Sequence, residues 1–138
     1  MAKYVYEVLE LASKGTKAAK VKVLKENETW ALKDVLRATF DKKVQFNLPG
    51  GEPPYTASEE HNHPSNLLRE HKNFMYFVKG IKAGDDLPAY KREKIFLGML
   101  EAVHPSDARI LIDMINKKAP KGITRPVVEE AFPGLLQD

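Results

Sequence analysis

The chain contains no cysteine, which excludes disulfide bonds and thiolate metal ligands and suits a reducing compartment. No apolar run approaches the roughly 20 residues that a membrane-spanning helix requires. Near the N-terminus, Glu7 and Glu10 interrupt the apolar stretch that a secretory signal would need. We therefore expect an intracellular protein with no membrane association. Its length is that of a single domain, residues 1–138.

The sequence also lacks the short motifs of the common catalytic sites. It contains no glycine-rich phosphate loop, no Gly-x-Ser-x-Gly turn and no His-Glu-x-x-His zinc helix. The one suggestive cluster is SEEHNHP, where His61 and His63 follow two glutamates. Two imidazoles spaced in this way can reach one metal ion, but nothing nearby fixes a third ligand. We therefore expect a solvated polar loop, and neither enzyme activity nor a metal, cofactor or small-molecule substrate.

Basic residues are unevenly distributed along a chain whose net charge is only +3. Residues 1–50 carry ten Lys/Arg against six Asp/Glu, whereas residues 51–66 carry three glutamates and no basic residue. Residues 117–138 carry four Lys/Arg against three Asp/Glu. A net charge this small does not by itself indicate a nucleic-acid partner. What matters is whether lysines from both ends of the sequence fold onto one face.

Apolar residues recur at helical spacing in seven segments, which predicts an all-α fold. Thr16 and Thr29 are placed to cap the second and third segments, and His104 is a turn or cap residue before Pro105. In the third segment we expect Trp30 to belong to the buried stripe. The segments cover about residues 3–13, 17–26, 30–40, 64–80, 87–103, 106–117 and 125–132.

The stretch at about residues 41–63 contains Gly-Gly, Pro-Pro and several other turn-forming residues. We interpret it as one long Pro/Gly-rich loop whose tip, about residues 50–63, is mobile. In the segment that follows, Phe74 and Phe77 are spaced for a buried helix face, so we assign them to the core and expect only Tyr76 to reach the surface. The predicted architecture is a compact bundle of about seven short helices with this single long loop.

Lysines gather at the start of the second predicted helix, in the stretch KGTKAAKVKVLK. Gly15 and Thr16 begin the helix, and Lys17 and Lys20 follow within its first two turns. Free backbone N–H groups and the positive end of the helix dipole favour a phosphate at such a position. The alternative is an ordinary solvated surface, which the spacing alone favours.

A second basic helix start lies near the end of the sequence. Three lysines lead to a glycine and a threonine, and the glycine allows the backbone to approach a ligand closely. The threonine hydroxyl can cap the helix or bond a phosphate oxygen. The residues concerned are Lys117, Lys118, Lys121, Gly122, Ile123, Thr124 and Arg125.

Three stretches together resemble the N-terminal DNA-binding domain of ATP-dependent DNA ligases, in particular the compact form found in T-even phage ligases. They are ELASKGTKAAKVKVLKEN with the following ALKDVLRATFD, then FMYFV, and finally GITRPVVEEAFPGLL. The last is the most specific, because a Gly-x-Ser/Thr turn leads to a short helix closed by aromatic-Pro-Gly-Leu. The chain is also similar to a family of small tailed-phage proteins that share the patterns LPxGxPPY and KGITxxVVxxAFPGL.

The resemblance implies an all-helical domain that grips duplex DNA across the minor groove on both sides of a nick, mainly through phosphates and sugars. By matching position, it nominates Gly15, Thr16, Lys17 and Lys20 for contact with the DNA backbone. It nominates Gly122, Ile123 and Thr124 in the same way. Charge and proximity add the remaining candidates, Lys117, Lys118, Lys121 and Arg125.

The chain departs from the ligases where their catalytic domain would begin, and it contains no Lys-x-Asp-Gly adenylation motif. We therefore expect a stand-alone, non-enzymatic, phage-encoded protein in the host cytoplasm that binds nicked or intact duplex DNA during replication, recombination or repair. One alternative is an interaction module that binds a host or phage protein, with the 50–63 loop and the GLLQD stretch as contact elements. Another is a minor virion component.

Overall fold

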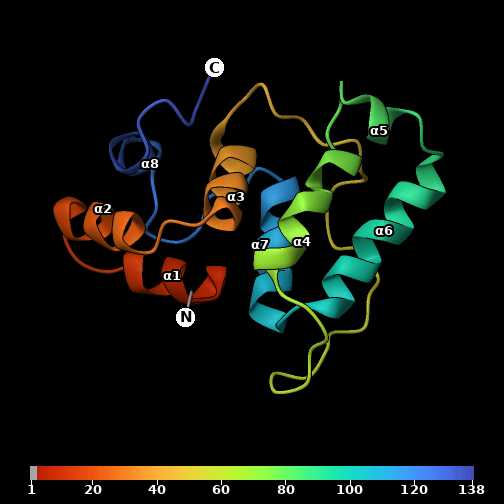
Figure 1. The fold of residues 1–138 in the computed structure, drawn as a ribbon, viewed down its shortest axis with the longest axis horizontal. Helices are drawn as coiled ribbons and strands as arrows, with labels where there is room; N and C mark the ends of the chain where they lie inside the picture. Colours follow the sequence, from red (N-terminus) through yellow and green to blue (C-terminus); the bar gives the residue numbers. More distant parts are fainter. Residues whose placement is uncertain (1–2) are drawn as a thin grey trace.

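The computed structural model describes residues 3–138 and confirms the all-α prediction (Figure 1). Within these residues, regular structure is helical, and extended pairing is limited to isolated bridges between Phe46 and Val78 and between Glu59 and Asn62. The helices are α1 (Val5–Ala12), α2 (Lys17–Glu26), α3 (Trp30–Phe40), α4 (Leu67–Glu70), the 3₁₀-helix η1 (His71–Tyr76), α5 (Lys82–Asp85), α6 (Ala89–Ala102), α7 (Pro105–Ile115) and α8 (Arg125–Ala131).

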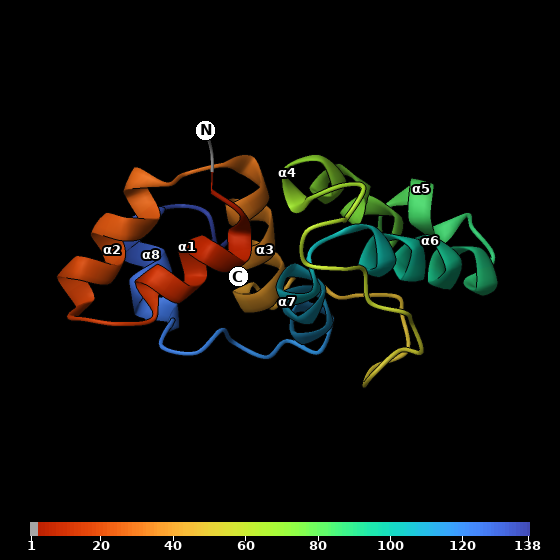
Figure 2. The ribbon, with the colours of Figure 1, turned by 90° about the horizontal axis from the view of Figure 1, so that it is seen from below.

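The helices α3 and α7 pack against each other and separate two groups of helices (Figure 1). One group contains α1, α2 and α8, and the other contains α4, η1, α5 and α6. Although α8 is last in sequence, it returns to lie against α2, as the view from below shows (Figure 2). The buried apolar side chains form one continuous cluster, to which α3 gives Leu32, Val35 and Leu36 and α7 gives Leu111 and Ile112. Burying each such side chain stabilises the fold by about 1.5–3 kcal/mol.

The cap predictions for the second and third helices are confirmed. The hydroxyl of Thr16 accepts a hydrogen bond from the backbone N–H of Ala19 at 3.2 Å, and that of Thr29 accepts one from Leu32 at 3.1 Å. These caps fix where α2 and α3 begin, because each satisfies an N–H group that has no partner within its helix.

Two predictions for individual segments are wrong. The single helix expected over residues 64–80 is the short α4 followed by η1, and α5 is an additional helix. The tighter 3₁₀ turn places residues three apart directly above one another, so Phe74 and Phe77 both enter the core, as predicted. Trp30 is 71% exposed instead of buried. As the first residue of α3 it lies off the buried stripe, and the ammonium of Lys33 covers its ring at 4.1 Å from the centroid.

The long loop is bonded to α7 and to the residues that directly follow α6 and α7. The amide of Asn116 exchanges two hydrogen bonds with the backbone of Gly51, at 2.8 and 3.1 Å. The carboxylate of Glu52 pairs with Arg109 at 2.8 Å, and the hydroxyl of Ser58 donates to the carbonyl of Val103 at 2.6 Å. The tip that the sequence predicts to be mobile is therefore attached at several points between residues 51 and 58.

Lys117 connects the end of α7 to the end of α3. Its ammonium donates to the carbonyl oxygens of Ala38, Asp41 and Val44 at 2.5, 3.0 and 2.5 Å. Within the described chain, Lys117 is the one non-glycine residue with positive φ, at 57°, and it forms the left-handed turn that closes α7. Partial burial lowers the pKa of its ammonium, while the carboxylates of Asp41 and Asp138 act in the opposite direction. The side chain thus supplies a cation where α3 leaves carbonyl groups unpaired.

We expect Lys117→Met to lower the free energy of unfolding by about 2–4 kcal/mol, because it removes charge-assisted hydrogen bonds and leaves carbonyl groups without their donor. Lys118→Met, at the exposed neighbouring position, is the matched control and should change stability by less than about 0.5 kcal/mol. Urea denaturation measures both. Equal stability of the two variants would mean that solvent replaces the ammonium.

Candidate functional site

The two basic helix starts, about 100 residues apart in sequence, meet on one side of the molecule. The ammonium of Lys20 donates to the carbonyl oxygen of Gly122 at 2.6 Å. The backbone of Gly122 also lies directly against the carbonyl group of Ser13. In Figure 2, α2 and α8 lie side by side. We call the surface formed by residues 13–20 and 118–124 the basic corner.

Residues 14–19 of the basic corner are exposed. The side chains of Lys14, Thr16 and Lys17 are exposed, and Gly15 has φ +91°, which a glycine adopts readily. The ammonium of Lys17 lies 3.6 Å from the carboxylate of Glu130 on α8, in a solvent-exposed pair. Such pairs contribute little to stability, so Lys17 can exchange this partner for another anion.

In the second half, Gly122 serves a close contact within the chain. A Cβ atom on Gly122 would lie 2.4 Å from the carbonyl oxygen of Ser13, and its φ is +76°. The missing side chain therefore lets the α8 start approach the end of α1, whereas the sequence suggested an approach to a ligand. Ile123 is 2% exposed and belongs to the core. Thr124 is exposed and precedes α8, but its hydroxyl makes no capping hydrogen bond.

Three of the predicted cations are bound within the protein. Besides Lys20 and Lys117, the guanidinium of Arg125 donates to the carbonyl oxygen of Phe40 at 3.0 Å and pairs with the carboxylate of Asp138. That pairing holds the pKa of Asp138 well below its usual range. These three half-buried side chains therefore have partners within the protein.

Four exposed lysines remain at the basic corner: Lys14, Lys17, Lys118 and Lys121. Acidic groups accompany two of them: Glu130 lies beside Lys17, and Glu52 lies near Lys118. The Arg109 hydrogen bond, together with the nearby charges of Arg109 and Lys118, lowers the pKa of the Glu52 carboxyl. Lysines on flexible stems, beside backbone N–H groups, bind phosphate groups without reading base edges. The basic corner therefore presents positively charged side chains that can bind anions.

The histidine-containing loop forms a different feature. The rings of His63, His104, Tyr4 and Tyr6 cluster together, with Tyr6 stacked on His104 at 4.3 Å between centroids. Nδ1 of His104 accepts a hydrogen bond from the backbone of Ser106 at 3.0 Å, which confirms its prediction as a cap residue. Over residues 3–138, no group of three or more His, Asp or Glu side chains is arranged to hold a metal ion.

Asp107 lies beneath this ring cluster and is fully buried. One carboxylate oxygen accepts a hydrogen bond from the backbone N–H of Tyr6 at 2.9 Å, and the other has no hydrogen-bond partner in the protein. Burial raises the pKa of the Asp107 carboxyl to about 6, and the Tyr6 hydrogen bond and the nearby His63 limit the rise. The Asp107 carboxyl therefore changes its protonation state near pH 6, within the pH range of ordinary stability measurements.

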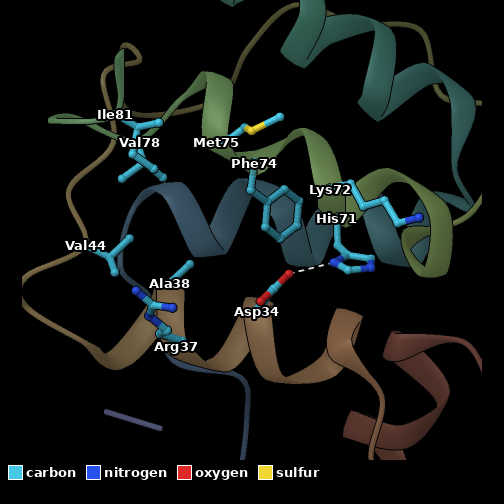
Figure 3. A pocket seen from close by; sticks show the side chains of 10 residues that line it. All are labelled: Asp34, Arg37, Ala38, Val44, His71, Lys72, Phe74, Met75, Val78 and Ile81. Carbon is cyan, nitrogen blue, oxygen red and sulfur yellow. Dashed lines mark hydrogen bonds and ion pairs between the residues drawn. The ribbon is translucent and has the colours of Figure 1, made fainter. Parts of the chain in front are cut away.

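A hollow of about 390 Å³ lies between α3 and η1 (Figure 3). Its apolar part includes Phe74, Met75 and Ile81, while Arg37 and Lys72 bring positive charge. Sequence reasoning missed this α3–η1 groove, because the residues that line it come from separate segments. The only available signal was the helical spacing of Trp30, Asp34 and Arg37 along one face of α3.

We expect Gly122→Ala to lower the free energy of unfolding by about 2–4 kcal/mol, since it combines an unfavourable positive φ with a clash against backbone atoms of Ser13. Gly98→Ala is the matched control, because a Cβ there meets open space within α6. That change should be neutral or stabilise by up to about 1 kcal/mol. Chemical denaturation should show a loss of stability for Gly122→Ala alone, and similar values for both variants would contradict the close contact.

We expect Asp107→Asn to change how stability depends on pH. Because the folded pKa of about 6 exceeds the unfolded value of 3.8, protonated Asp107 favours the fold, and this contribution is lost as pH rises from about 4 to 6. The stability of the variant relative to the original chain should therefore increase over this range, by up to about 3 kcal/mol. Urea denaturation at several pH values measures it, with the exposed Asp86→Asn as control. A difference that is independent of pH would contradict it.

Comparison with known proteins places the chain in a family. Residues 8–121 match the family described as "Family of unknown function (DUF6433)". The match includes the first basic helix start and ends before Gly122. No curated protein matches the chain. None of the helices in residues 3–138 has the length and apolar character needed to cross a membrane. Since the match extends over most of its length, the chain belongs to DUF6433.

Proposed function

We propose that the chain is a non-enzymatic DNA-binding protein that contacts the phosphate backbone of duplex DNA through the basic corner, with little sequence preference. The observation that carries the proposal is the meeting of the two basic helix starts, joined by the bond from Lys20 to the carbonyl oxygen of Gly122. This contact puts exposed lysines from both ends of the sequence on one surface. A surface with several exposed lysines can neutralise neighbouring phosphates of one duplex.

The strength of binding follows from the lysines that remain exposed. Four of them, Lys14, Lys17, Lys118 and Lys121, are available to neutralise phosphates. Lys20, Lys117 and Arg125 are half-buried and bonded to carbonyl groups of the chain, so we expect them to contribute mainly through the longer-range field. Because each neutralised phosphate contributes about 0.9 to the slope of log affinity against log salt, the slope should be roughly −3 to −4.

The proposed biological setting rests on the resemblance to ligase DNA-binding domains. In those enzymes the domain holds the duplex on both sides of a nick. The nominated residues, Gly15, Thr16, Lys17 and Lys20 with Gly122, Ile123 and Thr124, lie within the basic corner here. A separate protein of this kind would mark nicks or ends, or bring other proteins to them, during phage replication, recombination or repair in the host cytoplasm. Nicked and intact duplexes are therefore the substrates to compare.

We expect the double variant Lys118→Glu and Lys121→Glu to weaken binding to a short labelled duplex by about tenfold or more at low salt, and to make the salt slope shallower by about 2. Fluorescence anisotropy with nicked, intact and single-stranded DNA measures both quantities. The matched control is Lys91→Glu with Lys94→Glu, which makes the same change of charge on the exposed face of α6. Thermal unfolding should be nearly unchanged in both double variants.

Each outcome of this titration decides one part of the proposal. Absence of binding at low salt would reject DNA binding altogether. Equal losses in the two double variants would reject the basic corner as the contact surface, because binding would then depend only on the overall charge. Tighter binding to single strands than to duplexes would reject the duplex as the substrate.

A further inference from the structure

We propose that the α3–η1 groove docks a short segment of a partner protein that combines a large apolar side chain with an acidic one. The groove shares no residue with the basic corner, so this inference goes beyond the proposed function and does not depend on it. It rests on three features of the groove: exposed apolar side chains, their concentration at one place, and two cations on its rim.

Exposed apolar side chains gather at the groove. Five large apolar residues are substantially exposed in the described chain: Leu11, Trp30, Met75, Ile81 and Tyr90. Two of these, Met75 at 42% and Ile81 at 39%, line the same hollow. Trp30 begins the same face of α3 that presents Asp34 and Arg37 to the groove. Single exposed apolar residues need no explanation, but their grouping around a hollow marks a contact surface.

The hollow has the shape and size for side chains of a partner. In Figure 3 the ring of Phe74 points into the space above α3, and Val44, Val78 and Ala38 complete the apolar lining. The volume of about 390 Å³ lies near the lower end of the range for ligand pockets, roughly 300–1,000 Å³. A space of this size suits one or two large side chains of a peptide better than an entire cofactor.

The charges at the rim determine the kind of segment that fits. Arg37 and Lys72 are exposed, and in Figure 3 they lie on either side of Phe74. The lining carboxylate, Asp34, is held by Nδ1 of His71 at 2.6 Å, so the two cations are left to face an incoming segment. Acidic side chains beside an apolar anchor would pair with them, which favours such partners and disfavours basic ones.

The lining favours a peptide over a nucleic acid. Proteins that bind single strands stack bases on accessible aromatic faces along a basic channel. Here the lining ring, Phe74, is 6% exposed, so it offers little surface for stacking. Met75 and Ile81 add aliphatic surface, which packs against side chains. The groove therefore resembles the apolar slots that receive anchor residues of a docked peptide.

The test uses three labelled synthetic peptides of equal length. The first carries phenylalanine and leucine flanked by aspartates, the second replaces the apolar residues with serine, and the third replaces the aspartates with lysine. Fluorescence anisotropy measures affinity, and amide shifts in NMR spectra of the full chain locate the contact. We expect the first peptide to bind about tenfold or more tightly than the other two and to shift amides of residues 34–38 and 71–81.

Variants separate this groove from other surfaces. Arg37→Glu with Lys72→Glu should weaken the first peptide about tenfold or more, and Met75→Ser should weaken it without a change of charge. Leu11→Ser is the matched control, an exposed apolar residue away from the groove. It should leave the affinity unchanged. The same change of charge in Lys118→Glu with Lys121→Glu should weaken the first peptide far less than Arg37→Glu with Lys72→Glu does.

Three results would overturn the proposal. The first is that no peptide binds at millimolar concentration. The second is that the first and second peptides bind equally, which would show charge attraction alone. The third is that a thymidine oligonucleotide shifts the same amides and displaces the first peptide, which would assign the groove to a single strand. Circular dichroism of each variant confirms that its fold is retained.

Discussion

The ammonium of Lys117 at the end of α3 is the contact on which the arrangement of the molecule depends. It binds carbonyl groups of Ala38, Asp41 and Val44, and so fixes the end of α7 and the start of the long loop against one helix terminus. The guanidinium of Arg125 binds a further carbonyl group at the same helix end, that of Phe40. Two stretches about 80 residues apart in sequence converge there because a helix C-terminus attracts cations. The position of α8, and with it the second half of the basic corner, follows from this convergence.

The sequence predicted local structure well, because local structure depends on neighbouring residues. Thr16 and Thr29 cap their helices because each hydroxyl needs only an N–H group three residues ahead. The roles of the cations could not be predicted in the same way. Lys117 and Lys118 are adjacent and chemically identical, yet one is bound within the protein and the other is exposed. The difference arises from residues almost 80 positions earlier, which a local pattern does not contain.

The errors in the prediction have the same origin. Trp30 was expected in the core because large apolar residues at helical spacing usually face it, but its place at the first residue of α3 turns the ring outward. The α3–η1 groove forms where η1 packs on α3, and the sequence predicted one continuous helix over residues 64–80. From the sequence, one could say only that the two basic helix starts must meet if they are to share a surface. The tertiary structure shows that they do meet.

The contact between Gly122 and Ser13 has a consequence for the order in which the chain folds during its synthesis. A ribosome makes α1 and α2 first, and domains begin to fold from their N-terminal parts as they emerge. The partner of these helices, α8, is among the last elements of the described chain to be made, so the apolar residues Val21 and Leu24 of α2 must wait for it. During that interval the two lysine clusters are not yet joined. The assembled surface therefore requires that α8 has been made, and a nascent chain without α8 lacks it.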